Sequence, residues 1–291
     1  MQPTSLAPTK QLETYELTVR PILREDVDLL HQLSIAVAWP HRREDWLLLL
    51  DVGQGIVACD EIGRVVGSAM WFSFGPALAS IGMVITSPRL QAHGAGRWLM
   101  DRVFLEATEP TKVLNATRAA YRLYVSMGFQ PGPKVFQNQG IATAPPSVPG
   151  LARPMTEGDL DAIRALDAAA TGGDRSRALD RLLALSEGTV IARGGAVTGY
   201  ALCRRFGRGH VVGPVVAASA EDAVALTAPH VAARTGKFVR VDTRETEGPF
   251  CDFLAAAGIK AYDTVTSMSL GAPQPEPQGA RVFGLANQAL G

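Results

Sequence analysis

Neither sign of charge is in excess in this sequence, and that balance excludes two classes of partner. Lys and Arg together number 28, as do Asp and Glu, so the formal net charge at pH 7 is zero. Proteins that bind nucleic acid or anionic lipid usually concentrate basic charge. No apolar run approaches the ~18 residues of a membrane span, and the first ten residues hold no apolar run typical of a signal peptide. The sequence therefore predicts neither a nucleic-acid partner nor a membrane partner.

Cysteine is scarce as well. The three cysteines, Cys59, Cys203 and Cys251, are far apart and odd in number, which fits a reducing cytoplasm better than a disulfide framework. Each is expected to be a small core residue. The five histidines and three cysteines show no metal-ligand spacing, so no metal site is predicted. We expect a cytoplasmic protein that is a monomer or a homodimer.

The chain of 291 residues is long enough for two domains, and its internal similarities indicate a duplication. The segment 139–150, QGIATAPPSVPG, is rich in proline and small residues and predicts a linker. Four patterns recur across it in the same order, at an offset near 130 residues: Arg20-Pro21 as Arg153-Pro154, Gly67 as Gly199, Ile81-Gly82-Met83-Val84-Ile85 as Val212-Gly213-Pro214-Val215-Val216, and the segment 123–129 as 253–259. The predicted domains are 1–138 and 151–271, with a tail at 272–291 that holds a candidate edge strand from Arg281.

Each copy is expected to be an α+β unit. The first begins with a strand at 17–20, a helix at 25–38 with Val27, Leu30 and Ile35 on one face, and a helical segment at 45–50. A hairpin at 56–60 and 65–74, a buried strand at 80–86, a helix at 94–107, a strand at 113–115, a helix at 118–127 and a last strand from 129 follow. The predicted fold is a mixed, mainly antiparallel sheet flanked by helices, present twice in tandem.

The segment 83–97 carries the most chemical information. A buried strand enters a loop with two glycines, Gly94 and Gly96, which opens directly into a helix. Glycines allow a ligand close to the backbone, and the free N–H groups and positive dipole end of the helix bind anions. There is no acidic residue between Gln91 and Arg97. The Gly-Lys-Ser/Thr ending of a P-loop and the spacing of a dinucleotide loop are both missing. A tight strand-to-helix turn without a ligand remains the alternative for these residues alone.

Two motifs in this region resemble the GNAT acyltransferase superfamily. Gln91-Ala92-His93-Gly94-Ala95-Gly96 is similar to its Gln/Arg-x-x-Gly-x-Gly/Ala signature, and the segment 123–129, LYVSMGF, is similar to its Leu-Tyr-x-x-x-Gly-Phe signature. The resemblance covers 17–138 closely and 151–271 by architecture. It implies an N-acetyltransferase that uses acetyl-CoA.

The resemblance also implies roles for individual residues. The backbone of Met83, Val84 and Ile85 would pair with the pantetheine arm, and Tyr124 would lie beside the thioester sulfur. A phenol can donate a proton or a hydrogen bond to a departing thiolate; a core tyrosine is the alternative, with Tyr121 one turn earlier. The pyrophosphate would lie on the amides of the loop formed by Gln91, Ala92, His93, Gly94, Ala95, Gly96 and Arg97.

The first copy departs from the superfamily pattern in two places. Thr117 stands where many members carry Asn, seven residues before the tyrosine, and would take over its hydrogen bond to the cofactor. The strand at 80–86 contains no carboxylate, so the sequence assigns no general base.

The second copy lacks both chemical motifs. It has no Gly-x-Gly, and Ser219 followed by Glu221 and Asp222 is typical of an ordinary helix start. Leu254 stands where the first copy has Tyr124. We expect a degenerate C-terminal GNAT domain that kept the fold and lost cofactor binding, as in tandem bacterial acetyltransferases.

Three residues are candidates for binding the acceptor. Trp39 lies between the first two helices, where the superfamily builds its acceptor wall. Trp71 lies on the third strand and could face the core or the cleft, and Asn115 ends the strand beside the expected acetyl position. Helix packing is the alternative for Trp39.

The function that these observations favour is acetyl transfer from acetyl-CoA to a primary amine of a small molecule or amino acid. A protein N-terminus or a lysine side chain is the alternative acceptor, although a neutral chain argues against basic protein tails. A protein that binds CoA for regulation, without turnover, is the alternative from another class.

Overall fold

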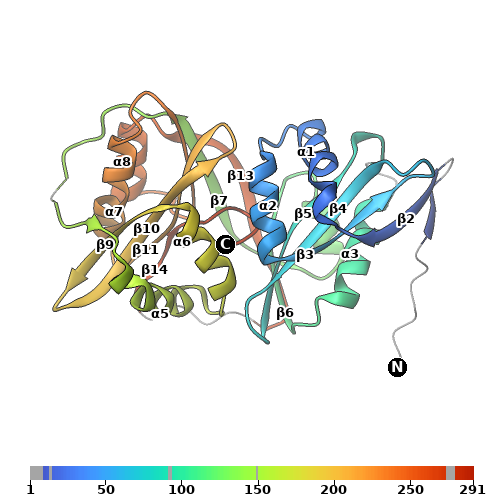
Figure 1. Cartoon of the computed structure of the whole chain (residues 1–291), viewed down its shortest axis with the longest axis horizontal. Coiled ribbons are helices and arrows are strands. Elements are labelled where there is room, and N and C mark those ends of the chain that lie inside the picture. The colour runs from blue at the N-terminus through green and yellow to red at the C-terminus, as the bar shows by residue number, and fades with distance from the viewer. Residues whose placement is uncertain (1–8, 13–14, 91–93, 149, 273–278) are drawn as a thin grey trace.

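A single mixed sheet runs through the whole molecule (Figure 1). In the computed structural model the described residues are 9–12, 15–90, 94–148, 150–272 and 279–291. Within them, 14 strands join in the order β1-β2-β3-β4-β5-β6-β13-β7-β12-β11-β10-β9-β8, with β14 paired to β11. Helices cover both faces, which is the predicted mixed sheet flanked by helices.

The first half follows the predicted order of elements. Its first helix buries Val27 and Leu30, as expected, but Ile35 is 60% exposed and Leu33 is buried in its place. Ile35 lies eight residues after Val27, which turns it to the edge of the apolar stripe. The elements are β1 (Thr9–Leu12), β2 (Tyr15–Pro21), α1 (Val27–Ala36), α2 (Arg43–Val52), β3 (Gln54–Cys59), β4 (Val65–Ser73), β5 (Leu78–Thr86), α3 (Ala95–Glu106), β6 (Thr111–Ala116), α4 (Tyr121–Ser126) and β7 (Gln130–Ile141).

The second half repeats this order. Its strongly amphipathic helices pack Ile163, Leu179 and Leu182 into the same core as α1 and α2. The elements are β8 (Arg153–Pro154), α5 (Leu160–Thr171), α6 (Ser176–Leu185), β9 (Glu187–Arg193), β10 (Ala196–Phe206), β11 (Gly209–Ala217), α7 (Ala220–Ala232), β12 (Phe238–Thr243), α8 (Pro249–Ala256), β13 (Lys260–Leu270) and β14 (Arg281–Gly284).

The last strands of the two halves are exchanged. Strand β7 pairs with β12 of the second half, from Phe136↔Thr243 to Ile141↔Phe238. Strand β13 pairs with β6 of the first half, and β7 and β13 also pair with each other. Figure 1 shows these two strands crossing the middle of the molecule. The predicted linker at 139–150 therefore overlaps the end of β7. The domain boundary at 138 stays a prediction about where the first sequence repeat ends.

Strand β14 lies inside the second half and not at the edge that the sequence indicated. Its partners on β11 are Val215, Val216 and Ala217. The other side of β11 is taken by β10, and the Leu285 N–H donates to the Asp242 carbonyl of β12 at 2.8 Å. The segment 281–285 thus fills the gap where β11 and β12 diverge.

Both halves begin with the same ion-pair lock. The Arg20 guanidinium donates to both oxygens of Asp26 at 2.6 and 2.7 Å, and Arg153 does the same to Asp159 at 2.8 and 2.7 Å. The Arg20 hydrogen bonds hold the pKa of the Asp26 carboxyl below its usual value against a smaller effect of burial. The duplicated Arg-Pro motif is therefore a structural feature, which connects β2 to the start of α1 and β8 to the start of α5.

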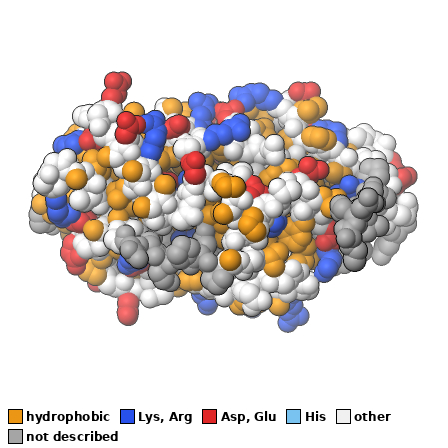
Figure 2. Space-filling model, turned by 90° about the horizontal axis from the view of Figure 1, so that it is seen from below, with side chains coloured by type: hydrophobic (Ala, Val, Ile, Leu, Met, Phe, Trp, Pro, Cys, Tyr) orange, Lys and Arg blue, Asp and Glu red, His pale blue; other side chains and the backbone are white. Residues whose placement is uncertain are grey.

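The surface mixes the two signs of charge. On the face seen in Figure 2, basic and acidic side chains are interspersed. Among the helices in the described part of the chain, none is long and apolar enough to cross a membrane.

Candidate functional site

The site begins where β5 and β6 diverge. These strands pair in parallel from Leu78↔Thr111 to Ile81↔Leu114 and then separate. On the other side of β5, Met70 pairs with Gly82 and Ser68 with Ile85, so Met83 and Val84 together oppose one residue of β4. Met83 has a positive φ of 52° at this bulge. A bulge re-aims the local backbone groups, and this one lies at the open edge where the resemblance places the pantetheine arm.

The start of α3 is open to an anion. Its N-cap is Gly94, in the left-handed conformation with φ 77°, and no side chain caps the helix. The first turn contains no acidic residue, so its free N–H groups keep their positive potential. The Lys10 ammonium donates to the Gly94 carbonyl at 3.0 Å and adds a cation. Gln91, Ala92 and His93 lie outside the described residues; Ala95 is buried, and Arg97 is exposed near Ser126.

Tyr124 lies in α4, whose Ser126 accepts a hydrogen bond of 3.3 Å from Arg97 in the first turn of α3. Tyr124 is 5% exposed, and its ring meets Phe129 edge-on at 5.8 Å. Burial raises the pKa of its phenol, so the hydroxyl keeps its proton at neutral pH. Among the described residues the hydroxyl has no hydrogen-bond partner. Thr117 lies before the same helix, where its hydroxyl accepts a hydrogen bond of 3.4 Å from the Ala120 N–H.

A cavity of about 320 Å³ lies on the other face of the sheet, between the two halves. The first half contributes the α1–α2 connection, the diverging ends of β5 and β6, and β7. The second half contributes the β10–β11 turn, β13 and the segment 287–289. Its volume is at the small end of the usual range for small-molecule sites, roughly 300–1,000 Å³. We call it the interdomain pocket.

The segment 287–289 forms one wall of this pocket. The Ala289 carbonyl accepts a hydrogen bond from the Ser80 hydroxyl at 2.7 Å. Ala289 also packs closely on Gly82, since a Cβ added to Gly82 would lie only 2.6 Å from the Ala289 Cβ. Asn115 donates to the Gln288 carbonyl at 2.8 Å and accepts from the Ser267 hydroxyl at 2.8 Å. The Asn115 amide thus holds the wall of the pocket in place.

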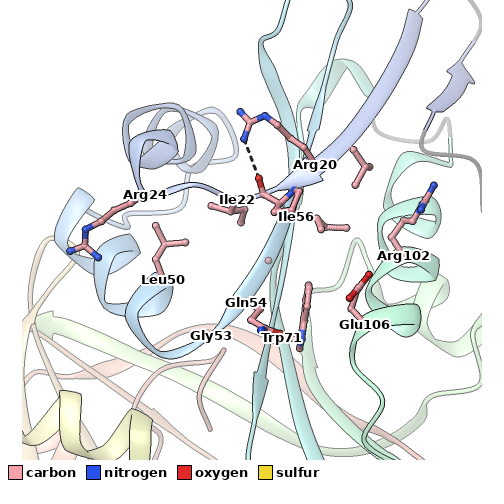
Figure 3. A pocket seen from close by; sticks show the side chains of 13 residues that line it. Arg20, Ile22, Arg24, Leu50, Gly53, Gln54, Ile56, Trp71, Arg102 and Glu106 are labelled. Carbon is pink, nitrogen blue, oxygen red and sulfur yellow. Dashed lines mark hydrogen bonds between the residues drawn. The ribbon is translucent and has the colours of Figure 1, made fainter.

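The structure separates the two candidate tryptophans. Trp39 lines the interdomain pocket with its ring 5.7 Å from that of His41. Trp71 is buried on the α3 side of the sheet and lines a different cavity of about 490 Å³. Figure 3 shows Trp71 beside Arg102 and Glu106 of α3, at the Gly53–Ile56 end of β3. Trp71 therefore lies apart from Trp39 and Asn115.

The corresponding positions of the second half are closed. Ser219 caps α7 by accepting from the Asp222 N–H at 3.2 Å, and Asp222 forms two hydrogen bonds with Arg193 at 2.6 and 2.7 Å. Leu254 is 1% exposed in the position of Tyr124. On β11, the residues that match Val84 and Ile85 are Val215 and Val216, and they already pair with β14. In the second half the chain itself thus occupies this strand edge, whereas no described strand pairs with the corresponding edge of β5 beyond Ile81.

Four polar residues, one beside the start of α3 and three in the interdomain pocket, were not singled out from the sequence. Lys10 precedes the first predicted element, and Arg208 and Asp263 come from the second half, so nothing in their local sequence signals a site. His41 lines the pocket, and its Nδ1 has no partner among the described residues. Burial lowers the pKa of His41 to about 4, with Arg240 and Arg204 acting in the same direction against Asp45. His41 is therefore a neutral imidazole at pH 7.

The comparisons with known proteins agree with this geometry. Family models described as acetyltransferase (GNAT) domains match residues 51–131 and 163–284, one in each half. The chain is a tandem GNAT acetyltransferase. No three His, Cys, Asp or Glu side chains of the described residues are grouped as a metal site.

Similar proteins span the whole length of this acetyltransferase. YitH of Bacillus subtilis, described as an uncharacterized N-acetyltransferase, is 29% identical over 92% of this chain and 96% of its own. A Pyrococcus horikoshii protein assigned provisionally as an acetyltransferase has the same fold, with a TM-score of 0.80, 18% identity, and coverage of 94% of this chain and 96% of that one. A tandem GNAT protein from the clavulanic acid biosynthesis pathway has a TM-score of 0.63, 16% identity, and coverage of 89% and 100%.

Proposed function

We propose that this acetyltransferase transfers the acetyl group of acetyl-CoA to a primary amine of a small molecule or amino acid, and that the first half alone holds the cofactor. The observation that carries the proposal is the asymmetry of the two openings. Among the described residues of the first half, no side chain caps α3 and no strand pairs with the β6-side edge of β5 beyond Ile81, whereas in the second half β14 pairs along β11 and Ser219 and Asp222 satisfy the helix start.

The residues present fit the cofactor. Gly94 adopts a left-handed conformation without strain, and no side chain caps α3, so an anion can approach the backbone N–H groups of its first turn. Gly96 allows Leu123 of α4 to pack close to this helix start, since a Cβ there would lie 3.3 Å from Leu123. Lys10 supplies a cation that could lie next to the pyrophosphate. When bound, acetyl-CoA supplies a thioester whose carbonyl carbon an amine can attack.

Tyr124 is the proposed catalytic residue. Its phenol stays protonated because burial raises its pKa, and it has no competing partner among the described residues. It can therefore donate its proton, or a hydrogen bond, to the sulfur that leaves. The bulge at Met83 and Val84 re-aims backbone groups of β5, and in this proposal a backbone N–H of the bulge orients the acetyl carbonyl.

Two residues on the acceptor side could receive the amine proton, directly or through water. His41 is a neutral imidazole in the pocket, and Asp263 is a carboxylate on its rim. The small volume of about 320 Å³ supports a small molecule over a protein chain as the acceptor. Trp39 and Asn115 are the proposed acceptor-side residues of the first half, and Trp71 is not among them.

A panel of small amines and short peptides, with acetyl-CoA and a thiol-sensitive reagent, tests the proposal. We expect free thiol to accumulate catalytically with at least one class of small amine. Thiol release only with peptides would instead indicate a protein acetyltransferase. Tight CoA binding without thiol release from any amine would indicate a regulatory protein.

A further inference from the structure

The interdomain pocket contains a cation whose charge is not compensated. Arg208 lies in the turn between β10 and β11, is exposed, and lines the pocket. Among the described residues its guanidinium has no hydrogen-bond or ion-pair partner. Arg240, the other arginine of the pocket, differs, because it donates to both oxygens of the buried Asp242 at 2.8 and 2.6 Å. Arg208 is thus the arginine of this pocket that is free to bind a ligand.

The carboxylate in the same pocket does not neutralise Arg208. Asp263 of β13 lines the pocket and accepts a hydrogen bond from the Thr264 N–H at 2.7 Å. No ion pair joins it to Arg208 within the described residues. An arginine that faces a ligand cavity without a partner is typically used for a carboxylate or phosphate, which its planar fork can bind with two hydrogen bonds.

The turn that carries Arg208 is held rigidly against the first half. Asp45, which is 3% exposed at the start of α2, accepts a hydrogen bond from the Gly207 N–H at 2.9 Å. Arg42 pairs with Asp45 and donates to the Arg205 carbonyl at 3.0 Å. These contacts join the two halves at Arg205 and Gly207, directly before Arg208 in the chain. Burial raises the pKa of the Asp45 carboxyl, but the hydrogen bonds from Arg42 and Gly207 lower it more, so the clamp stays charged at neutral pH.

Aromatic packing fixes the same turn from inside. Phe206, next to the turn, is 4% exposed and meets His41 edge-on at 5.4 Å. The guanidinium groups of Arg204 and Arg240 lie over its ring at 5.1 and 5.4 Å. A binding group on such a fixed support is preorganised and loses little freedom when a ligand arrives.

We propose that the acceptor is an amine that also carries an oxyanion, a carboxylate or a phosphate, and that Arg208 binds this oxyanion. The inference rests on the proposed function, and it names the chemical class of the acceptor. It also assigns a task to the second half: the half that has no open cofactor slot supplies the group that selects the substrate.

Matched pairs of amines test this proposal. Each ω-amino carboxylate of three to six carbons, and each of several α-amino acids, is compared with its primary amide. Aminoalkyl phosphates are compared with the corresponding amino alcohols. Steady-state thiol release from acetyl-CoA gives kcat and KM for each. We expect the anionic member of the favoured pair to have a kcat/KM about 10- to 100-fold higher, the usual effect of a hydrogen bond to a charged group. The favoured pair also distinguishes carboxylate from phosphate.

Variants assign the effect to Arg208. Arg208→Gln should raise KM for the anionic amine about 10- to 100-fold, with kcat little changed and the neutral partner unaffected. Arg205→Gln is the matched control, because Arg205 is an exposed arginine of the same hairpin that does not line the pocket. Asp263→Asn removes a negative charge from the same pocket, so it should not lower the preference for the anionic member of a pair.

Different results overturn different claims. Preference for neutral amines, or an anion preference that survives in Arg208→Gln, would overturn this inference while leaving the proposed function intact. Loss of the preference in Arg205→Gln or Asp263→Asn to the same extent would also overturn it. The absence of thiol release from every amine would count against the proposed function, and the inference would fall with it.

Discussion

The two halves of this molecule share one frame and differ at the openings of their sheets. Both have the Arg–Asp lock, the paired helices over one face and the diverging pair of parallel strands. In the described part of the first half, no strand fills the space where β5 and β6 diverge, and no side chain caps the start of α3. In the second, Ser219 and Asp222 satisfy the helix start, and β14 is hydrogen-bonded along β11. The frame depends on packing that both copies keep, whereas the candidate site depends on a few residues and on a strand edge without a partner strand in the described first half.

Two corresponding arginines of the two halves make different contacts. Arg42 and Arg175 are the N-caps of α2 and α6, corresponding helices of the two halves. Arg42 reaches across to the β10–β11 turn, and Arg175 donates to the carbonyls of Leu290 and Gly291 at 2.7 and 2.6 Å. Arg42 thus positions the turn that carries Arg208, and Arg175 anchors the C-terminal segment whose residues 287–289 line the pocket.

The largest expected effect comes from giving the first half the helix start of the second. Gly96 and Glu221 are the second residues of α3 and α7. Gly96→Glu places a carboxylate where the pyrophosphate is expected, and should weaken acetyl-CoA binding roughly 10³-fold. The wild-type chain should bind one acetyl-CoA, measured by calorimetric titration. Glu221→Gly is the matched control and should leave affinity unchanged. Two equivalent sites, or equal effects of both variants, would contradict the asymmetry.

A second prediction tests the anchor of the pocket wall. Asp167 pairs with Arg175 at 2.8 Å and also accepts from the Tyr200 hydroxyl, and both charged side chains are almost fully buried. Asp167→Asn leaves the Arg175 charge buried and unpaired, so we expect a loss of about 3–5 kcal/mol in the free energy of unfolding. Denaturant unfolding measures it. Asp180→Asn, in the exposed pair with Arg164, should cost less than about 1 kcal/mol. A loss in Asp167→Asn as small as that in Asp180→Asn would show that the Asp167–Arg175 pair does not stabilise the fold.

The third prediction concerns Tyr124, which Leu254 replaces in the second half. Tyr124→Phe keeps the ring and its packing on Phe129 and removes only the hydroxyl. We expect kcat to fall about 10²-fold or more while acetyl-CoA affinity changes little, because the charge on sulfur develops in the transition state. Steady-state kinetics with calorimetry separate the two. Tyr121→Phe, on the same helix, should have little effect, and equal small effects would make Tyr124 a packing residue.

The smallest effect should be the same in both halves. Asp26→Asn and Asp159→Asn each weaken one Arg–Asp lock, and each should lower the Tm by a few degrees at pH 7. The pKa values of both carboxyls are held below the ordinary value by the hydrogen bonds from Arg20 and Arg153. Their contribution to stability is therefore complete above pH ~4 and is lost as the pH falls toward the folded-state pKa. The differences from wild type should shrink below pH 4 in thermal melts, and a difference unchanged at pH 2 would argue against the ion pair.

Local patterns in the sequence were sufficient for most of the frame. Alternating apolar residues at 65–74, the glycine at 128 after a helical pattern, and the recurring motifs are confirmed as β4, the end of α4 and the two-fold repeat. Such features depend on neighbours within a few residues and on which face is apolar. The predicted apolar face of α1 is less accurate, because Ile35 is exposed and Leu33 is buried.

The family, the two halves, and Tyr124 with the start of α3 as the candidate site could all be predicted from the sequence alone. Those assignments depend on short contiguous motifs, whose physics is local. Three features follow only from tertiary contacts. Strands β7 and β13 are exchanged, β14 fills the space between β11 and β12 of the second half, and Trp71 lies apart from Trp39. The tertiary structure also brought Arg208 and Asp263 to the pocket beside residues more than a hundred positions away. Strand pairing and pocket walls are made by contacts between distant segments, which no local pattern encodes.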